Sequence, residues 1–389
     1  MARVVQGGTE EVPLSFVFPC LNEERTLETC VKQVDDSLST LGIPYEIVVA
    51  DNGSTDQSVS IAQSLGCSVV HVNIRGYGAA LAAGTVAARG RFVIFADCDN
   101  TYLYQHAAEL FRTAEAGDYD LAIASRMTGD IQPGAMPFLH RYLGTPVLTT
   151  LINLFFKGHL TDCNSGFRCV KKTSYLQWQI RSTGMEFASE LLIKALKAKS
   201  KIVEIKSGLR PGPPGRVAHL NTWRDGMRHL LFILSERPRV FELPGLALTI
   251  LATVLQIAAA LIGPVAIAGK FHIFGIHTQI LLLLAALVGA HSYMFACNLF
   301  LESDDPPLPV TKRILNLHEG TLFFFLLLVN GMAAGLVTYL MLVWSASSFA
   351  NLNVVNFLMF FVHILAVTFT AAFGLLGVHI LRKAKRTRI

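Results

Sequence analysis

The sequence of 389 residues lacks every cysteine pattern that would indicate a structural metal or a disulfide framework. Its seven cysteines form no Cys-x-x-Cys pair and show no metal-type spacing with histidine. They are Cys20, Cys30, Cys67, Cys98, Cys163, Cys169 and Cys297. These absences exclude a zinc site of the usual spacing, and they predict a reducing, cytosolic location for the water-soluble part of the chain.

Long hydrophobic runs are missing from residues 1–240, and residues 1–13 have no apolar core, which predicts no signal peptide. The net charge is only +5, and this modest excess does not indicate a nucleic-acid partner. However, 52% of the chain is hydrophobic and the mean hydropathy is +0.46, values too high for an ordinary soluble enzyme. Because the excess lies in 243–381, we predict a water-soluble N-terminal half and a membrane-embedded C-terminal half.

The N-terminal half alternates short apolar runs with stretches of helical periodicity. The apolar runs predict strands at 14–19, 45–50, 67–72 and 91–96. Strands that alternate with helices of this length are typical of a mainly parallel, three-layer α/β fold.

Two carboxylates, Asp97 and Asp99, directly follow the predicted strand at 91–96. The carboxyl ends of strands in α/β sheets face the crevice where such proteins bind ligands. Two hard oxygen ligands there suit Mg²⁺ or Mn²⁺, which complete their coordination with substrate phosphates. The alternative is a solvated acidic turn.

Gly76 and Gly78 open the helix that follows the third predicted strand. They do not form a dinucleotide-binding motif, because Leu81 stands where the third glycine would be. The amides at this helix start could face a phosphate. Alternatively, the glycines ease a tight turn between strand and helix.

Three motifs occur in order at the ends of predicted strands: Phe-Pro-Cys-Leu-Asn-Glu-Glu at 18–24, Val-Ala-Asp-Asn-Gly-Ser-Thr-Asp at 49–56 and Phe-Ala-Asp-Cys-Asp-Asn-Thr-Tyr at 95–102. Together they resemble the family-2 glycosyltransferases, whose GT-A fold is Rossmann-like and binds nucleotide sugars. The later motifs resemble the branch that glycosylates polyprenyl phosphates, typified by dolichyl-phosphate mannose and glucose synthases. These motifs lie at 124–126, 136–144, 162–168 and 184–190. The resemblance covers roughly residues 12–240.

The resemblance implies that Asp97 and Asp99 hold a metal against the donor diphosphate. Related mannose synthases offer a glutamine two residues after the second aspartate, where this chain has Thr101. Water, Asn100 or substrate oxygens would then complete the coordination.

In the same way, Asp51 is implied to bind the nucleobase or ribose, with Asn22 and Glu23 shaping the opposite wall of the pocket. The other residues assigned to the cofactor site are Pro19, Gly53, Ser54, Gly76, Gly78 and Cys98.

The acceptor determines whether the enzyme needs a general base. A phosphate monoester has a second pKa of about 6 and is already an anionic nucleophile at neutral pH. Such an acceptor needs cations that position it, and arginine is the expected residue. The resemblance assigns Arg126, Arg141 and Arg168 to acceptor and diphosphate contacts, and Thr145 to a hydroxyl contact with the acceptor phosphate.

Glu186 is a candidate base for a hydroxyl acceptor. It reads equally well as part of the acidic first turn of a helix. The predicted catalytic residues are Asp99, Arg126, Arg168 and Glu186.

The loop at 209–220 departs from the related enzymes, which carry Arg-x-x-Gly-x-Ser-Lys-Leu before the membrane. Here the Ser-Lys pair is replaced by Ala218 and His219. Arg210, Arg216 or His219 would then take over the donor-phosphate contact, and the density of proline and glycine predicts a mobile lid. The departure weakens an assignment to GDP-mannose and favours UDP over GDP.

Two helices before the membrane half, at 142–156 and 221–234, have the composition of helices in the headgroup layer; a core helix is the alternative for the first. Apolar segments long enough to span a membrane lie at about 243–268, 276–301, 320–344 and 356–381. The predicted domains are a catalytic domain at 1–220, a juxtamembrane region at 221–242 and a transmembrane domain at 243–389.

Basic residues determine the predicted orientation. Lys312 and Arg313 follow the second span and five more basic residues follow the fourth, whereas 345–355 contains none. The positive-inside rule therefore places the catalytic half, the 302–319 loop and the tail in the cytoplasm.

The sequence thus predicts a multi-pass enzyme that moves a hexose (glucose-like or N-acetylhexosamine-like) from a nucleotide sugar to a polyprenyl phosphate, with inversion and with Mg²⁺ or Mn²⁺. One alternative is transfer to a hydroxyl-bearing lipid or a polysaccharide. Another is a membrane scaffold or flippase partner with a degenerate transferase domain. The sequence leaves open whether the chain forms a homo-oligomer.

Overall fold

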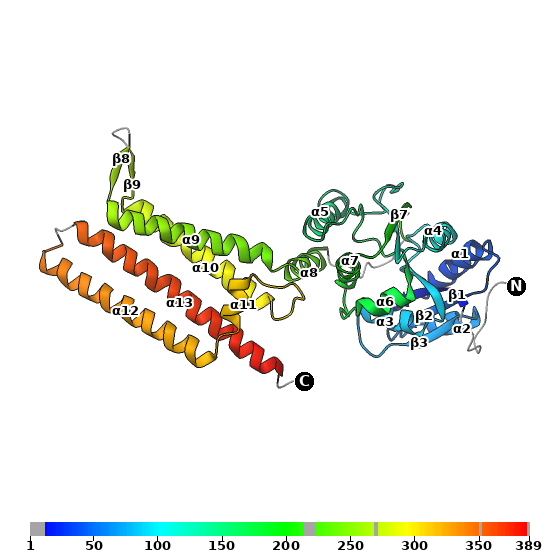
Figure 1. Cartoon of the computed structure of the whole chain (residues 1–389). Coiled ribbons are helices and arrows are strands. Elements are labelled where there is room, and N and C mark those ends of the chain that lie inside the picture. Colours follow the sequence, from blue (N-terminus) through cyan, green and yellow to red (C-terminus); the bar gives the residue numbers. More distant parts are fainter. Residues whose placement is uncertain (1–11, 214–221, 268–270, 350–351, 387–389) are drawn as a thin grey trace. The chain divides into compact units, whose positions relative to one another are not determined.

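The computed structural model describes residues 12–213, 222–267, 271–349 and 352–386. The chain divides into two compact units, Met1–Ile233 and Leu234–Ile389. Figure 1 shows a sheet with helices in the first unit and long helices in the second.

The first unit is built on a seven-stranded sheet with the order β3-β2-β1-β4-β6-β5-β7. The strands are β1 (Val12–Cys20), β2 (Tyr45–Asp51), β3 (Ser68–His71), β4 (Gly90–Phe95), β5 (Leu121–Ser125), β6 (Arg168–Lys171) and β7 (Ile202–Lys206). Only β6 runs antiparallel to its described neighbours, β4 and β5. The predicted α/β fold with a mainly parallel sheet is confirmed.

Helices cover both faces of this sheet (Figure 1). They are α1 (Leu27–Ser39), α2 (Ser58–Ser64), α3 (Tyr77–Ala87), α4 (Ala107–Ala116), α5 (Thr145–Phe156), α6 (Lys172–Trp178), α7 (Phe187–Lys197) and α8 (Thr222–Ser235). Short 3₁₀ and π turns precede α4 and α5, at Tyr104–His106 and His140–Gly144.

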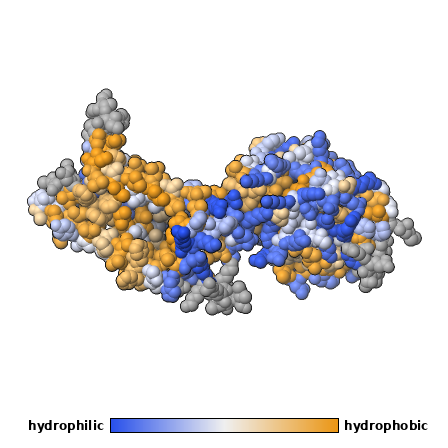
Figure 2. All heavy atoms as spheres, in the orientation of Figure 1, coloured by the Kyte–Doolittle hydropathy of each residue, from blue (hydrophilic) through white to orange (hydrophobic). Residues whose placement is uncertain are grey.

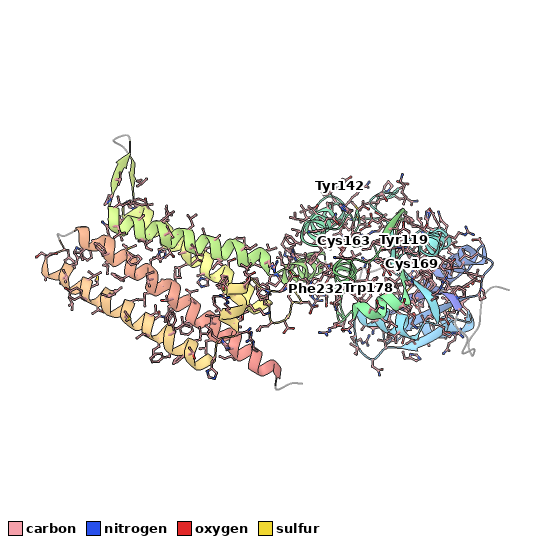
Figure 3. All side chains as sticks on the ribbon, in the orientation of Figure 1. Tyr119, Tyr142, Cys163, Cys169, Trp178 and Phe232 are labelled. Carbon is pink, nitrogen blue, oxygen red and sulfur yellow. The ribbon has the colours of Figure 1, made fainter. Side chains whose placement is uncertain are left out.

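Neighbouring side chains of a strand enter opposite cores, as the period of two requires. In β1, Phe16 and Phe18 lie in the core under α1, α2 and α4, whereas Val17 lies in the core under α3, α5, α6 and α7. Figure 3 labels Trp178 and Phe232, which both belong to the second core.

The first predicted interfacial helix, around α5, has apolar side chains both in the core and on the surface. Leu148 and Ile152 of α5 are buried in the core. Phe138 and Tyr142, which precede α5, and Leu154 within it are 73%, 60% and 70% exposed. Their position at a membrane surface stays a prediction.

The second unit contains α9 (Arg239–Ile262), α10 (Ile276–Leu299), α11 (Pro309–Leu315), α12 (Glu319–Ala346) and α13 (Leu352–Arg386), with a hairpin of β8 (Val265–Ile267) and β9 (Phe271–Ile273). Within the described residues, α9, α10, α12 and α13 are long and apolar enough to cross a membrane. Figure 2 shows hydrophobic residues over most of the visible face of this unit. The first predicted span ends earlier than expected, because Gly263 terminates α9 and the hairpin begins.

Polar side chains link three of these helices inside the bundle. Gln256 on α9 donates to Gln279 on α10 (3.1 Å), and Gln279 donates to Asn356 on α13 (2.8 Å). Thr253 and His363 form a second contact between α9 and α13 at 3.0 Å. These bonds pair side-chain N–H groups of Gln256 and Gln279 that would otherwise be costly in an apolar interior.

Candidate functional site

The carboxylate of Asp51 lies at the end of β2 and organises the loop that follows it. It accepts hydrogen bonds from the amides of Ser54 (2.9 Å) and Gly53 (3.3 Å), and the ring of His71 lies 3.3 Å away. Burial raises its pKa, but the hydrogen bonds from Ser54 and His71 outweigh burial, so the pKa of Asp51 lies below its ordinary value. The carboxylate is therefore ionised at neutral pH.

The loop after β1 interlocks with this loop. Asn22 has left-handed backbone geometry (φ 58°), and its side-chain oxygen accepts from the amide of Thr55 at 2.8 Å. The amide of Glu23 donates to the Ser58 hydroxyl (2.9 Å), and the Glu23 carboxylate accepts from Thr26. Asn22 and Glu23 thus fix two loops to each other, and their place in the wall of a nucleotide pocket stays a prediction.

Asn52 and Arg75, which were not predicted as site residues, join a third loop to the loop after β2. Asn52 donates to the carbonyl of Ile74 (2.7 Å) and accepts from the amide of Gly76 (2.8 Å). Arg75 donates to the carbonyl of Asn52 at 2.8 Å, and its guanidinium lies beside Gly53. Asn52 lies within the motif at 49–56, whereas Arg75 lies outside the motifs identified in the sequence.

The structure gives Gly76 and Gly78 a packing role. A Cβ on Gly76 (φ 142°) would lie 2.1 Å from the carbonyl oxygen of Thr183, and one on Gly78 would lie 2.4 Å from that of Ser182. The Ala79 amide, in the first turn of α3, donates to Thr183 at 3.1 Å. The backbone at 182–184 therefore covers this turn, and the contact with a phosphate stays a prediction.

Asp99 and Asp97 lie just beyond β4, next to the end of β1. The Asp99 carboxylate is 8% exposed and accepts from the Thr101 amide (3.0 Å) and hydroxyl (2.6 Å). Thr101 therefore orients the predicted metal ligand from the position where related enzymes carry glutamine.

Asp97 is surrounded by phenol groups. The Tyr77 hydroxyl hydrogen-bonds its carboxylate, and burial together with Asp97 raises the pKa of Tyr77, which keeps the phenol protonated. The Gly166 amide donates to the Tyr102 hydroxyl at 2.6 Å, and a Cβ on Gly166 would lie 3.3 Å from Asp97. Glycine is needed here because two phenols and a carboxylate converge on it.

The donor set fits Mg²⁺ or Mn²⁺, which accept two carboxylates and fill their remaining positions with water and phosphate oxygens. The described residues contain no group of three His, Cys, Asp or Glu side chains that could hold a metal by themselves. Asn100, one predicted source of a further ligand, instead accepts from Gln33 at 3.2 Å, and its carbonyl accepts from Arg210 at 2.8 Å. Water and substrate oxygens remain as further ligands.

The predicted loop residues are only partly described. Arg210 donates to Asn100 and to Gln33, which holds its guanidinium against α1. Arg216 and His219 lie outside the described residues.

Arg126 and Arg168 both have protein partners. Arg126 makes a two-bond ion pair with Asp162 (2.7 and 2.8 Å). Arg168 is 1% exposed and donates to three backbone carbonyls, those of Ser165, Cys163 and Ala188. Burial lowers the pKa of Arg168, whereas for Arg126 the Asp162 charge outweighs burial and raises the pKa. The two arginines shape the turn at 162–168, and their contact with an acceptor stays a prediction.

Arg141 and Thr145 lie around the π turn that opens α5, a feature frequent at functional sites. The guanidinium of Arg141 lies 5.5 Å from the centre of the Tyr142 ring. Thr145 is buried, and its hydroxyl accepts a hydrogen bond from the side-chain amide of Asn164 at 3.3 Å. Burial and the nearby charge of Arg126 lower the pKa of His140. The π turn therefore lies close to the ion pair of Arg126.

Glu186 precedes α7 and accepts from the amide of Gly184 at 3.3 Å. It lies close to His229, a buried residue on α8 that the sequence reasoning missed. His229 hydrogen-bonds Ser189 at 2.8 Å, and burial lowers its pKa to about 4, so it is neutral at physiological pH. The only sequence signal for His229 was its place one turn after Asp225 on an amphipathic helix.

The chain is similar in sequence to known glycosyltransferases. Residues 15–177 match the profile of Glycosyl transferase family 2. The chain is 34% identical to the low-salt glycan biosynthesis hexosyltransferase Agl6 of Haloferax volcanii, over 88% of this chain and 82% of that protein. It is 26% identical to the dolichyl-phosphate hexose transferase of the same organism, over 49% and 80%.

Among solved structures, glucosyl-3-phosphoglycerate synthase from Mycobacterium tuberculosis, in complex with Mn²⁺, UDP and glucosyl-3-phosphoglycerate, is similar at 22% identity and a TM-score of 0.46. That match covers 58% of this chain and 79% of the synthase. The extensive likeness to the hexosyltransferase, together with the profile match, shows that the chain belongs to glycosyl transferase family 2.

Proposed function

We propose that the chain transfers a hexose from a nucleotide sugar, with UDP favoured, to a polyprenyl phosphate at the cytoplasmic face of a membrane, with inversion at the sugar. The observation that carries this proposal is that Asp51 and Asp99 lie at one edge of the sheet, in a chain with four membrane-length helices. The similarity to a dolichyl-phosphate hexose transferase supports the acceptor.

The donor would bind across the ends of β2, β1 and β4. The ionised Asp51 would accept hydrogen bonds from the nucleoside, and the interlocked loops at 20–26 and 51–58 would hold its position. Asp97 and Asp99 would hold Mg²⁺ or Mn²⁺, which would neutralise charge on the leaving diphosphate. Thr101 and Tyr77 would fix the two carboxylates before the donor arrives, so that little reorganisation remains for the reaction.

The acceptor phosphate would itself be the nucleophile. One of its oxygens would form a bond to the anomeric carbon as the bond from that carbon to the diphosphate breaks, which inverts the configuration. No proton needs to be removed, because the phosphate is already anionic. Arg141 would hold the acceptor, while Arg126 and Arg168 support the turn that faces it.

The membrane half would place the catalytic domain where lipid phosphates emerge. We propose the domain limits 1–220, 221–242 and 243–389, with the catalytic domain, the 302–319 loop and the tail on the cytoplasmic side. Lys312 and Arg313 are exposed at the end of α11, as the positive-inside rule requires for a cytoplasmic loop. The exposed apolar side chains near α5 support contact with the bilayer surface.

A donor and acceptor panel tests this function. Purified full-length protein is given Mg²⁺ or Mn²⁺, a polyprenyl phosphate and UDP- or GDP-sugars in turn, and release of nucleoside diphosphate is measured. We expect release with one UDP-hexose that requires both the metal and the phosphorylated lipid. Release without the lipid phosphate group would contradict the proposed acceptor, and a silent panel would favour the scaffold alternative.

Glu186 favours a second candidate function, transfer to a hydroxyl-bearing lipid. Its carboxylate lies at the start of α7 near the neutral His229, where it could accept a proton from a hydroxyl acceptor. The same panel separates the two, because only this second function would accept a non-phosphorylated lipid.

Replacement of Arg141 by alanine is expected to raise the KM for polyprenyl phosphate about 10- to 100-fold, because a charge-assisted hydrogen bond contributes roughly 1.5–3 kcal/mol. The KM for the nucleotide sugar should change little. Arg112→Ala is the control, because Arg112 is another arginine of the first unit but is exposed and donates to the carbonyl of Thr40 from α4. Equal KM values for the lipid in both variants would contradict the role of Arg141.

A further inference from the structure

Two cysteines occupy matching positions at the ends of neighbouring parallel strands. β1 and β4 pair in parallel as far as Val17 opposite Phe95, and Cys20 and Cys98 each lie three residues beyond that pair. Neighbouring strands lie about 4.8 Å apart. Disulfides bridge Cα atoms that are roughly 4.4–6.8 Å apart, a range that includes the spacing of neighbouring strands.

The side chains of the two residues already meet. The Cys98 thiol donates to the carbonyl of Pro19 at 3.1 Å, which places it beside Cys20, and the two thiols lie close enough to shift each other's pKa. The Ser54 and Ser58 hydroxyls hydrogen-bond Cys20 from the nucleotide loop. The pair therefore lies between the loop of Asp51 and the carboxylates of Asp97 and Asp99.

Two other cysteines of the first unit have different neighbours. Cys30 on α1 contacts Tyr104, and Cys169 on β6 lies opposite Ile94 and Ala122. The structure shows no disulfide among the described cysteines.

We propose that Cys20 and Cys98 are a reversible oxidative modification site. A hydroperoxide would oxidise one thiol to a sulfenic acid, with the peroxide oxygen transferred to sulfur and water (from hydrogen peroxide) released. The second thiol would then attack that sulfur, form the disulfide and release a second water. A dithiol reductant would restore both thiols by exchange.

The disulfide would act on the proposed donor site. It would draw two sulfur atoms from contact distance to about 2.05 Å and pull the two strand ends together. Asp97 and Asp99 flank Cys98 directly, so both carboxylates would move relative to Asp51. A misplacement of about 1 Å in a reacting constellation can cost on the order of 10²-fold in rate. This consequence for activity rests on the proposed function, whereas formation of the bond does not.

Peptide mapping tests the bond itself. Full-length protein is treated with hydrogen peroxide, free thiols are alkylated, and a digest without reductant is analysed by mass spectrometry. We expect a linked pair of peptides that contain Cys20 and Cys98, lost after dithiothreitol and absent from Cys20→Ser. A link between Cys98 and Cys30, or oxidation beyond the sulfenic acid without any link, would overturn the proposal.

Activity gives the second readout, with each variant compared with its own untreated sample. Wild-type protein and the control Cys30→Ala are expected to lose activity about 10²-fold on oxidation and to regain it with dithiothreitol. Cys20→Ser is expected to resist inactivation. Equal inactivation of Cys20→Ser would overturn the proposed switch, and an enzyme inactive with every donor would refute the function while the mapping still decides the bond.

Discussion

Replacement of Asp99 by asparagine is expected to lower kcat for hexose transfer by about 10²–10³-fold, because electrostatic stabilisation of the leaving diphosphate would be lost. The substitution removes the charge but keeps an oxygen that can accept from the amide and hydroxyl of Thr101. The fold should therefore persist. Initial rates at several Mg²⁺ or Mn²⁺ concentrations, with thermal unfolding measured in parallel, provide the check.

The matched control for this experiment is Asp118→Asn. Asp118 is also an aspartate of the catalytic domain, but it is exposed and pairs with Lys171 at 2.8 Å. We expect that variant to keep its rate and metal response. An Asp99→Asn enzyme with an unchanged rate and unchanged metal response would contradict the metal-binding role.

The second large effect concerns stability. Replacement of Asp162 by alanine is expected to lower the free energy of unfolding by about 3–5 kcal/mol, because it leaves the buried guanidinium of Arg126 without its counter-ion. The Asp162 side chain is completely buried, and that of Arg126 is 12% exposed. Chemical denaturation of the full chain in detergent, with loss of a catalytic-domain signal as readout, measures the change.

The double variant Arg126→Met with Asp162→Leu is the control, because replacing both partners by apolar residues is often neutral or stabilising. If the single variant is as stable as wild type, the ion pair does not hold the turn at 162–168. If the double variant is as unstable as the single one, the hydrogen bonds that Asp162 accepts from the backbone amides of Arg126 and Asn164 are responsible and the buried charge is not.

The same ion pair predicts the acid limit of stability. Burial raises the pKa of Asp162, but the charge of Arg126 outweighs it, so the pKa lies below its ordinary value. A carboxyl with a lowered folded-state pKa contributes its full stabilisation above the unfolded value of about 3.9. The contribution is lost as pH falls toward the lowered value. The wild type should therefore lose stability in this acid range, while the double variant should lose less.

The central part of the fold was predictable because its strands are regular. The strands at β1, β2, β3 and β4 are apolar runs with helices of normal length between them, and periodicity alone predicts such elements. β6 was not predicted, since it has four residues and enters the sheet antiparallel between β4 and β5. Its place depends on contacts that no local pattern carries.

The candidate site was likewise predictable only in part. Asp51, Asp97 and Asp99 follow strands directly, so the sheet itself brings them together. The partners of the arginines come from elsewhere: Arg126 and Asp162 are 36 residues apart, and Arg168 takes part of its hydrogen bonding from Ala188. A sequence shows that an arginine is present, but only packing decides whether a carboxylate or a ligand receives its charge.

The amide chain from Gln256 through Gln279 to Asn356 bears on how the membrane half is made. Gln279 donates to Asn356 on α13, a helix that is synthesised after α9 and α10. Until α13 is in place, the pair of α9 and α10 holds amides whose hydrogen bonding is incomplete, and such groups cost roughly 1–3 kcal/mol each when buried. The pair of α9 and α10 is thus an intermediate whose hydrogen bonding is completed only when α13 packs against it. A chain that stopped before α13 would be a target for membrane quality control rather than a shorter anchor.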